Sequence, residues 1–388
     1  MKKTRIIALL TCVALCFTSL VGCGSKSYTA ENTEYVIGFS GPLTGAAAVY
    51  GEAVKNSAQM AVDEINAAGG LNGIKFKLVA TDDVHDATKV ATNYSTLYEG
   101  GMQVSLGTVT TAPGTEFTNL SKEDNVFFLT PSASGDEIPK YDNGFQMCFA
   151  DGNQGAVAAG FVNENYKNQT IGVFYKSDDP YSNGIFKQFK ENLDNSVTVV
   201  DAVFTEANTS DFSAQIDKLK DCKFIFMPIY YQPASDFMLQ AKTKMAPDAI
   251  YFGCDGFDGI EAKFDINSIS QKVTMLSHFN SKATEGAAAD FIAKYTEKYG
   301  TDTLNQFGAS AYDCVYAIYN AMKEAIEEGT EIPVTISASD LCDILKAKFA
   351  NGFTYSGVTG DNIKWQTNGY VDKGAIMYVI KETTADEK

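Results

Sequence analysis

Short apolar runs recur along the chain and alternate with segments of helical pattern. Valine, isoleucine, phenylalanine and leucine dominate these runs, and both faces of each run are apolar. This is typical of parallel strands that helices cover on both sides of a sheet. The runs lie at Tyr35 to Ser40, Phe76 to Thr81, Gln103 to Gly107, Val126 to Thr130, Ile171 to Tyr175, Val197 to Val203, Phe224 to Ile229 and Ala249 to Gly253.

Between these runs, apolar residues at 3.6-residue spacing predict helices. Such sets are Val54, Ala58, Ala61 and Ile65; Phe186, Phe189 and Leu193; Phe212, Ile216 and Leu219; and Phe237, Leu239 and Ala241. Residues 209–211 offer an N-cap for the helix of the third set. Because strand and helix alternate, we expect an α/β fold with parallel sheets. The length suits two lobes better than one core.

The N-terminus has the pattern of a secretory signal peptide. A basic start, Met1 to Arg5, precedes an apolar run from Ile6 to Phe17 that is too short to cross a membrane comfortably. Leu20-Val-Gly-Cys23 then resembles the lipobox of bacterial lipoproteins, in which the cysteine is lipidated and becomes the first mature residue. We therefore expect a signal peptide at 1–22, a lipidated Cys23 with a linker at 23–33, and anchoring by acyl chains to the outer face of the cell membrane.

Charge and composition exclude some classes of function. Residues 1–22 carry three basic and no acidic side chains, so their removal would change the net charge from −17 to −20. Such an acidic chain is poorly suited to nucleic acid. Arg5 is the only arginine, which excludes a guanidinium clamp on a carboxylate or phosphate in the mature protein.

Histidine is also scarce, with only His85 and His278 available. This leaves little material for a histidine-rich zinc site or a Ser-His-Asp triad. The sequence has no GxGxxG after the first strand, no P-loop and no GxSxG, so we expect no enzyme activity, no cofactor and no metal. Five cysteines follow Cys23, and none is spaced as CxxC. Buried free thiols are favoured, and a Cys222–Cys254 pair stays open.

One strand end looks suited to an anion. The strand ending at Gly107 precedes Thr108-Val-Thr-Thr-Ala-Pro-Gly114, in which Pro113 suits the first helical position. Thr110 or Thr111 is then a candidate cap, with backbone N–H groups and a helix dipole directed at a ligand. A carboxylate could be bound here without arginine. The alternative is that these threonines only cap the helix.

An ordered set of motifs resembles the leucine/isoleucine/valine-binding protein family, from about residue 34 to 383. The motifs are Tyr35-Val-Ile-Gly-Phe-Ser-Gly-Pro-Leu-Thr-Gly45, Tyr50-Gly51, the segment 61–73, Thr81-Asp82-Asp83, Leu106-Gly107 to Pro113, Thr130-Pro-Ser-Ala-Ser134 and Gly253-Cys-Asp-Gly256. The resemblance implies a type I periplasmic binding protein fold, in which two doubly wound parallel-sheet lobes are joined by three crossovers. These would lie near 147–153, 276–280 and 353–358. The lobes would be 34–148 with 279–353, and 149–278 with 354–383, before a tail at 384–388.

The resemblance also implies roles for individual residues. Thr111, beside Thr110, would contact a ligand carboxylate. Asp255 would pair with the ligand ammonium, although the branched-chain binders carry glutamate there and Asp255-Gly256 could simply form a turn. The loop residues Ser132, Ala133 and Ser134 would supply N–H, hydroxyl and carbonyl groups, and aromatic walls would come from Tyr50, Tyr181, Tyr230 and Phe307. Tyr231 leaves the register of Tyr230 open by one residue.

Elsewhere the chain departs from some relatives. His85 and Thr110 stand where those relatives have a disulfide, so this loop is not covalently joined here. We interpret His85 as a surface or turn residue.

The sequence therefore predicts an extracytoplasmic, monomeric solute-binding lipoprotein. It would capture a small aliphatic or aromatic amino acid between its lobes and deliver it to an ABC permease. Two alternatives remain: a ligand sensor with the same binding lobes, and a binder of an amide, urea or small aromatic acid.

Overall fold

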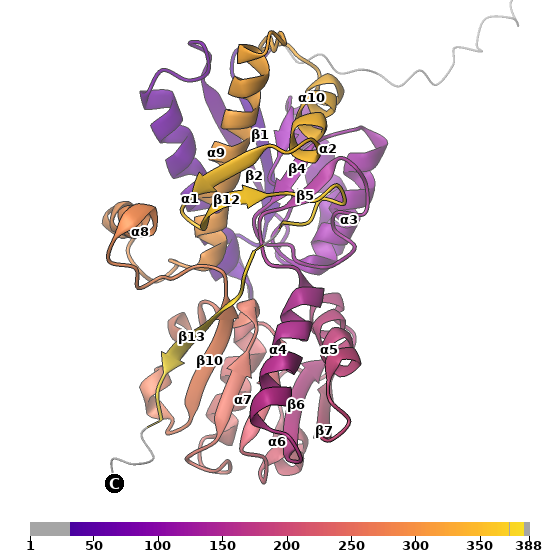
Figure 1. Cartoon of the computed structure of the whole chain (residues 1–388), viewed down its shortest axis with the longest axis vertical. Helices are drawn as coiled ribbons and strands as arrows, with labels where there is room; N and C mark the ends of the chain where they lie inside the picture. Colours follow the sequence, from indigo (N-terminus) through magenta and orange to yellow (C-terminus); the bar gives the residue numbers. More distant parts are fainter. Residues whose placement is uncertain (1–31, 372, 384–388) are drawn as a thin grey trace, which may run out of the picture.

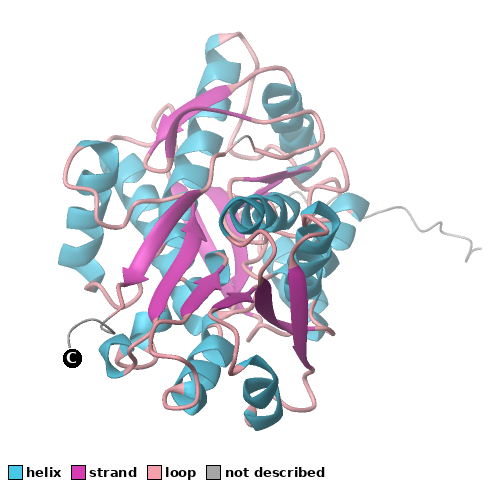
Figure 2. Ribbon diagram, turned by 60° about the horizontal axis from the view of Figure 1, so that its bottom comes forward, coloured by secondary structure: helices cyan, strands magenta, loops and turns pink. Residues whose placement is uncertain are grey.

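The computed structural model describes residues 32–371 and 373–383. The chain forms two α/β lobes stacked along the long axis of the molecule (Figure 1). Strands lie in the interior and helices surround them (Figure 2). The predicted signal peptide, Cys23 and the tail at 384–388 lie outside the described residues. No described helix is both long and apolar enough to cross a membrane.

The first lobe holds a five-stranded parallel sheet in the order β2-β1-β3-β4-β5. Its strands are β1 (Tyr35–Gly41), β2 (Phe76–Asp82), β3 (Val104–Ser105), β4 (Phe128–Thr130) and β5 (Gly144–Gln146). Its helices are α1 (Ala48–Ala67), α2 (Ala87–Glu99), α3 (Thr111–Glu123), α8 (Gly286–Tyr299), α9 (Gln306–Glu327) and α10 (Ala338–Ala350). The last three helices come from a distant part of the sequence, so this lobe is discontinuous.

The second lobe holds a six-stranded sheet in the order β13-β10-β9-β8-β6-β7, in which only β13 is antiparallel. Its strands are β6 (Thr170–Lys176), β7 (Thr198–Phe204), β8 (Phe224–Met227), β9 (Ile250–Gly253), β10 (Lys272–Ser277) and β13 (Ile376–Lys381). Its helices are α4 (Asp151–Asn165), α5 (Pro180–Asn192), α6 (Ser213–Leu219) and α7 (Tyr231–Ala241), with short 3₁₀ turns η1 (Asp255–Phe257), η2 (Ile260–Ala262) and η3 (Ile266–Ser268).

The predicted alternation of strand and helix is confirmed, with local differences. Every predicted strand is present, although β3 is only two residues long. The predictions missed β5, β10 and β13, and also the hairpin of β11 (Thr354–Gly357) and β12 (Gly360–Lys364). Leu239 is 45% exposed and does not belong to the buried face of α7. It lies two residues after buried Phe237, about 200° around the helix axis, and therefore points outward.

The position of the third crossover is corrected by the structure. The hairpin β11–β12 had been expected in the second lobe, but it lies on the first (Figure 1). The Tyr355 hydroxyl donates to Asp313 of α9 at 3.0 Å, and the Trp365 indole N–H donates to the Gln146 carbonyl at 2.7 Å. Residues 354–371 thus bury aromatic surface against the first lobe, and the chain crosses over only between 371 and 376.

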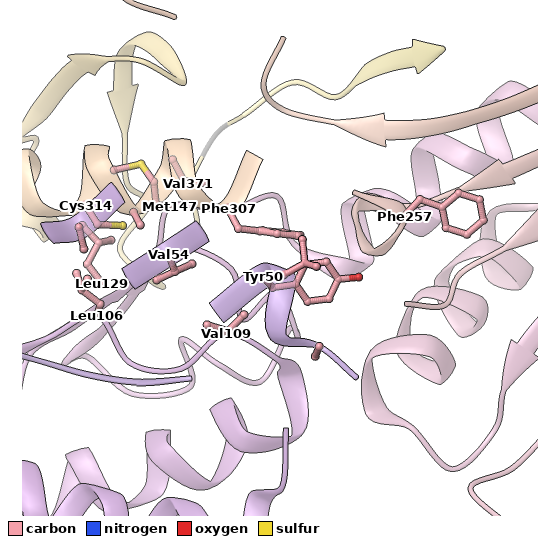
Figure 3. Packing of buried hydrophobic residues seen from close by; sticks show 14 of the residues in the cluster. Tyr50, Val54, Leu106, Val109, Leu129, Met147, Phe257, Phe307, Cys314 and Val371 are labelled. Atoms are coloured by element: carbon pink, nitrogen blue, oxygen red, sulfur yellow. The ribbon is translucent and has the colours of Figure 1, made fainter. Parts of the chain in front are cut away.

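Buried side chains form a continuous apolar cluster where the lobes meet. Tyr50, Val109 and Phe307 come from the first lobe and Phe257 from the second (Figure 3). The Tyr50 hydroxyl points towards the side on which Phe257 lies (Figure 3). The two lobes are therefore in contact in this structure, and the structure shows the protein in a closed arrangement.

Candidate ligand-binding site

A small cavity lies between the two lobes, with an empty volume of about 210 Å³. It sits beyond the carboxyl ends of β3 and β4 in the first lobe and of β6, β8 and β9 in the second, where open α/β sheets bind ligands. Its lining consists of Tyr50, Val109, Thr110, Thr111, Ser132, Ser134, Tyr181, Tyr230, Asp255 and Phe307. The structure thus brings together every predicted site residue except Ala133.

Two larger hollows lie elsewhere, but their chemistry does not point to a ligand. One lies beside η2, where Glu261 and Asp302 are exposed to water and Asp258 already accepts from the Gln306 N–H at 2.9 Å. The other lies between α9 and α10, where Lys348 is already paired with Glu324 and Glu328. The small interlobe cavity is therefore the better candidate, because its polar groups are buried and converge.

The N-terminus of α3 forms one side of the cavity. Thr110 is the N-cap residue, but its side chain makes no capping hydrogen bond. Pro113 is the third residue of the helix, so the prediction that it is the first helical residue was wrong by two residues. The N–H groups of Thr111 and Ala112 are left without an intrahelical acceptor. Thr111 is 1% exposed, and its hydroxyl finds no hydrogen-bond partner in the described part of the chain. This side of the cavity therefore suits an anion.

The loop after β4 supplies hydroxyl groups. Thr130 Oγ1 accepts from the N–H groups of Ser132 at 3.3 Å and Ala133 at 3.0 Å, so these two donors are already used. Ala133 is fully buried in the core, and its carbonyl accepts from Gln146 Nε2 at 3.0 Å. Ala133 therefore holds the loop and does not reach the cavity. The residues of this loop that line the cavity are Ser132 and Ser134.

Asp255 places a carboxylate on the opposite side. It is 2% exposed, and Oδ1 accepts from the Tyr181 hydroxyl at 2.7 Å. Oδ2 is buried without a hydrogen-bond partner among the described residues. Burial raises the pKa of Asp255 to about 6. Its backbone also begins η1, so the turn role and the cavity role coexist in one residue. The carboxylate is held in place and lacks a counter-charge.

Sequence reasoning missed a second buried carboxylate, Asp151, the first residue of α4. It is 2% exposed, and neither carboxylate oxygen has a hydrogen-bond partner within residues 32–371 and 373–383. Its pKa is raised well above the ordinary range, first by burial and then by Asp255. The side chain of Ser134 lies close enough to Asp151 to lower its pKa in part. The geometry shows no hydrogen bond between the Ser134 and Asp151 side chains. The available signal was an acidic residue inside the first predicted crossover.

Aromatic rings enclose the cavity from both lobes. Tyr181 and Tyr230 stack with centroids 4.4 Å apart, and Phe307 meets Tyr50 edge-on at 5.1 Å. The Tyr50 hydroxyl donates to the Gly256 carbonyl of the second lobe and accepts from the N–H of Tyr231 at 3.2 Å. These two bonds join the lobes beside the cavity. They also settle the register: Tyr230 lines the cavity, whereas Tyr231 packs in the core.

His85 was predicted to be a surface or turn residue, and it lies in a turn but not on the surface. It is half-buried, and its Nδ1 lies 2.8 Å from Thr110 Oγ1, at hydrogen-bonding distance. Its ring meets Tyr230 edge-on at 5.3 Å. A hydrogen bond therefore stands at the position where the family resemblance implied a disulfide in some relatives.

Across the cavity, the electrostatic pattern is that of a zwitterion site. Hydroxyl groups of the first lobe lie opposite the Asp255 carboxylate of the second, Asp151 lies near Asp255, and the lining residues include no lysine. Aromatic surface lies between the two polar ends. Among the described residues, no three His, Cys, Asp or Glu side chains are grouped to hold a metal ion.

Comparison with known proteins identifies the family. A family model described as "Periplasmic binding protein" matches residues 34–385. The Leu/Ile/Val-binding protein homolog 3 of Brucella melitensis is 31% identical over 325 residues, which cover 82% of this chain and 85% of that protein. The chain belongs to the leucine/isoleucine/valine-binding protein family. A leucine-, isoleucine-, valine-, threonine- and alanine-binding protein of Pseudomonas aeruginosa is 28% identical over 326 residues, 81% of this chain and 85% of that protein.

Solved structures of solute-binding proteins share the fold. The branched-chain amino acid transporter substrate-binding protein LivJ of Streptococcus pneumoniae, in complex with isoleucine, is 27% identical. Its TM-score is 0.77, with 91% of this chain and 98% of that chain covered. A benzoate-bound solute-binding protein of R. palustris matches with a TM-score of 0.75 at 16% identity, covering 90% of this chain and 94% of that one. The fold alone therefore does not define the ligand.

Family membership settles three broader predictions. The members are extracytoplasmic solute-binding proteins of ABC transporters, and this chain is a binding protein, not an enzyme. The prediction of buried free thiols is confirmed for the five cysteines in the described structure, which are Cys148, Cys222, Cys254, Cys314 and Cys342. The Cys222–Cys254 pair is thus not formed.

Proposed function

We propose that this protein is an extracytoplasmic solute-binding lipoprotein that captures a small α-amino acid and delivers it to an ABC permease. One observation carries the proposal: Asp255 and Asp151 are both almost fully buried, and three of their four carboxylate oxygens have no hydrogen-bond partner in the described chain. Buried charges of this kind are costly unless a counter-charge is supplied. A ligand ammonium group would supply it.

The other half of an amino acid has its own complement. The Thr111 hydroxyl has no hydrogen-bond partner among the described residues, and the helix dipole of α3 favours a carboxylate there. Anion and cation sites on opposite lobes fit one small zwitterion and explain how this site works without arginine. The contacts of Ser132, Ser134 and the aromatic residues with the ligand belong to the same proposal.

The ligands of relatives favour a small aliphatic side chain. The relative from Pseudomonas aeruginosa binds leucine, isoleucine, valine, threonine and alanine, and LivJ was solved with isoleucine. We therefore propose an aliphatic amino acid as the first candidate, ahead of an aromatic one.

The mechanism would be capture by closure. In the open form the first lobe would present α3 and the hydroxyl groups to the ligand carboxylate. Asp255, Tyr181 and Tyr230 of the second lobe would then reach the ammonium and the side chain. Closure excludes water, which strengthens each buried hydrogen bond. The Tyr50–Gly256 bond across the lobes would stabilise the closed form that a permease recognises.

Anchoring through Cys23 and a monomeric state complete the proposal. Replacing Cys23 with alanine should release the protein from the membrane fraction, because the acyl chains provide the attachment. Continued membrane association of Cys23→Ala would contradict the lipid anchor without affecting the ligand proposal.

A thermal-shift screen tests the ligand class. The chain from residue 24 onward is screened with the twenty common L-amino acids, simple amides, urea and benzoate, after removal of co-purified ligand. A ligand at 100 times its dissociation constant stabilises the folded state by about 2.7 kcal/mol. Shifts confined to aliphatic L-amino acids would support the proposal. Shifts with amides or carboxylic acids alone would contradict the ammonium site.

Transport and sensing are separated by a second experiment. Deletion of the gene should abolish uptake of the radiolabelled ligand by intact cells if the protein serves a permease. Normal uptake would instead favour the ligand-sensing alternative.

A further inference from the structure

His85 connects two residues of the cavity that belong to opposite lobes. It does not line the cavity itself, but its Nδ1 lies 2.8 Å from Thr110 Oγ1 of the first lobe. Its ring packs edge-on, at 84°, against Tyr230 of the second lobe with centroids 5.3 Å apart. The same imidazole therefore contacts the N-cap of α3 and a tyrosine of the other lobe that lines the cavity.

The loop that carries His85 is held in an unfavourable backbone conformation. Val84 has φ +49° and His85 has φ +65°, in the left-handed region that residues other than glycine rarely adopt. Two carboxylates maintain this geometry: Asp82 Oδ1 accepts from the Val84 N–H at 2.9 Å, and Asp83 Oδ1 accepts from the His85 N–H at 3.0 Å. Buried Asp83 is itself bonded by the Ser40 hydroxyl at 3.1 Å. Such strain persists only where the surroundings enforce it, often at functional sites.

Charged groups of both lobes surround the ring. Asp179, the buried N-cap of α5, faces it from the second lobe together with Lys176 and Glu206, and Asp86 faces it from its own loop. Burial lowers the pKa of His85, and Asp179 opposes this effect. The net direction is downward, so the neutral ring is favoured in the closed arrangement. When the lobes separate, water would return to the ring and its pKa would rise towards 6.5.

We propose that His85 is an interlobe positioning residue: its neutral ring orients Thr110 and supports Tyr230, which favours closure on the ligand, whereas its protonation favours opening. This inference rests on the proposed function, because it concerns the affinity for the captured amino acid. Closed protein binds a proton at His85 less readily than open protein, so acidification should weaken ligand binding through this residue.

Three variants separate the two contacts of the ring. His85→Ala removes both, His85→Phe keeps an aromatic contact with Tyr230, and His85→Asn keeps a polar group near Thr110. We expect about tenfold weaker affinity for His85→Ala at pH 7.5, mainly through faster dissociation, and smaller losses of about threefold for the other two. Val84→Ala is the matched control, since Val84 shares the strained loop, is 42% exposed and should change affinity less than twofold.

The decisive readout is the pH dependence of affinity, which a purely structural role would not change. Dissociation constants for L-leucine, L-alanine and L-phenylalanine are measured by calorimetry from pH 5 to 8 in the wild type and in His85→Phe. Asp255 titrates in the same range, so the quantity of interest is the difference between the two proteins. The wild type should lose more affinity than His85→Phe as pH falls below about 6.5.

The outcomes distinguish this inference from the proposed function. A wild type that binds none of the twenty amino acids of the thermal-shift screen contradicts the proposed function, and the role of His85 falls with it. A wild type that binds one of them, with His85→Phe and His85→Asn matching its affinity at every pH, overturns only the role of His85. If His85→Ala fails to fold, as judged by circular dichroism, the other two variants decide the question.

Discussion

Three aspartates are almost fully buried, yet their surroundings differ. Asp255, which lines the interlobe cavity, and Asp151 near it are each 2% exposed, and Asp313 of α9 is 0% exposed. Both oxygens of Asp313 are bonded: they accept from the Tyr355 hydroxyl, from the backbone N–H groups of Val358 and Thr359, and from the Thr359 hydroxyl, at 2.6–3.0 Å. At the cavity, three of four carboxylate oxygens have no partner in the described chain.

This difference separates a structural carboxylate from a ligand-binding one. Asp313 fastens the hairpin β11–β12 to α9, next to buried Lys373, whose pKa burial lowers to about 8. Native proteins pair nearly all buried polar groups, so unpaired ones require an explanation. At the cavity the missing partner is the proposed amino acid. Burial alone therefore does not identify a functional acid, whereas unsatisfied burial does.

The largest effect should come from Asp313→Ala. It would leave several buried donors without an acceptor and detach the hairpin, which should lower the free energy of unfolding by about 3–5 kcal/mol. Urea denaturation measures the loss, and Asp361→Ala, an exposed position in β12, is the control. The folded fraction should keep its ligand affinity within about threefold. If Asp313→Ala were as stable as the wild type, the structural role assigned to Asp313 would be wrong.

Asp255→Asn should mainly affect binding. Loss of the charge partner of a buried ammonium typically costs about 2–5 kcal/mol, so affinity should fall roughly 30-fold or more. Calorimetric titration with the best ligand of the screen measures it. Since asparagine has the same shape and no charge, the ligand-free variant should be at least as stable as the wild type. Unchanged affinity would mean that the ligand carries no ammonium group.

Stability of the ligand-free protein should depend on pH through Asp255. Its pKa in the folded protein is about 6 and its ordinary value is 3.8, so the folded state holds the proton more tightly. The resulting stability is present below pH 3.8 and is lost as pH rises through about 6, by roughly 1–3 kcal/mol. Asp83 and Asp258 act in the same sense, so the difference between wild type and Asp255→Asn isolates the effect. Equal pH profiles of stability for the wild type and Asp255→Asn would argue against this contribution of Asp255.

Asp151→Asn should have the smallest effect on binding. The carboxylate acts on the ammonium beside Asp255, and we expect about tenfold weaker affinity, equivalent to about 1.4 kcal/mol. Thermal unfolding should show a ligand-free protein that is slightly more stable, because the repulsion between Asp151 and Asp255 is removed. Lower stability with unchanged affinity would instead show that Asp151, like Asp313, has a structural role.

Local signals accounted for much of the fold and of the candidate site. The apolar runs that became β1, β2, β6, β7 and β8 are long enough for their pattern to be visible in the sequence. By contrast, β5 has a single apolar residue and produced no apolar run, whereas β13 is an apolar run that the prediction overlooked. The hairpin β11–β12 was placed on the wrong lobe, because its position depends on Asp313 and Gln146, which are distant in sequence.

At the site, the sequence by itself determined which groups are available. It excluded arginine, nearly excluded histidine, and placed threonines, serines, aromatic residues and Asp255 at strand ends that parallel sheets bring together. Only the tertiary structure decided which of these groups remain unpaired. It showed that Ala133 turns into the core, that Asp151 joins Asp255, and that His85 meets Tyr230 of the other lobe. Hydrogen bonding and burial depend on contacts between distant segments, and a single sequence records the segments but not their contacts.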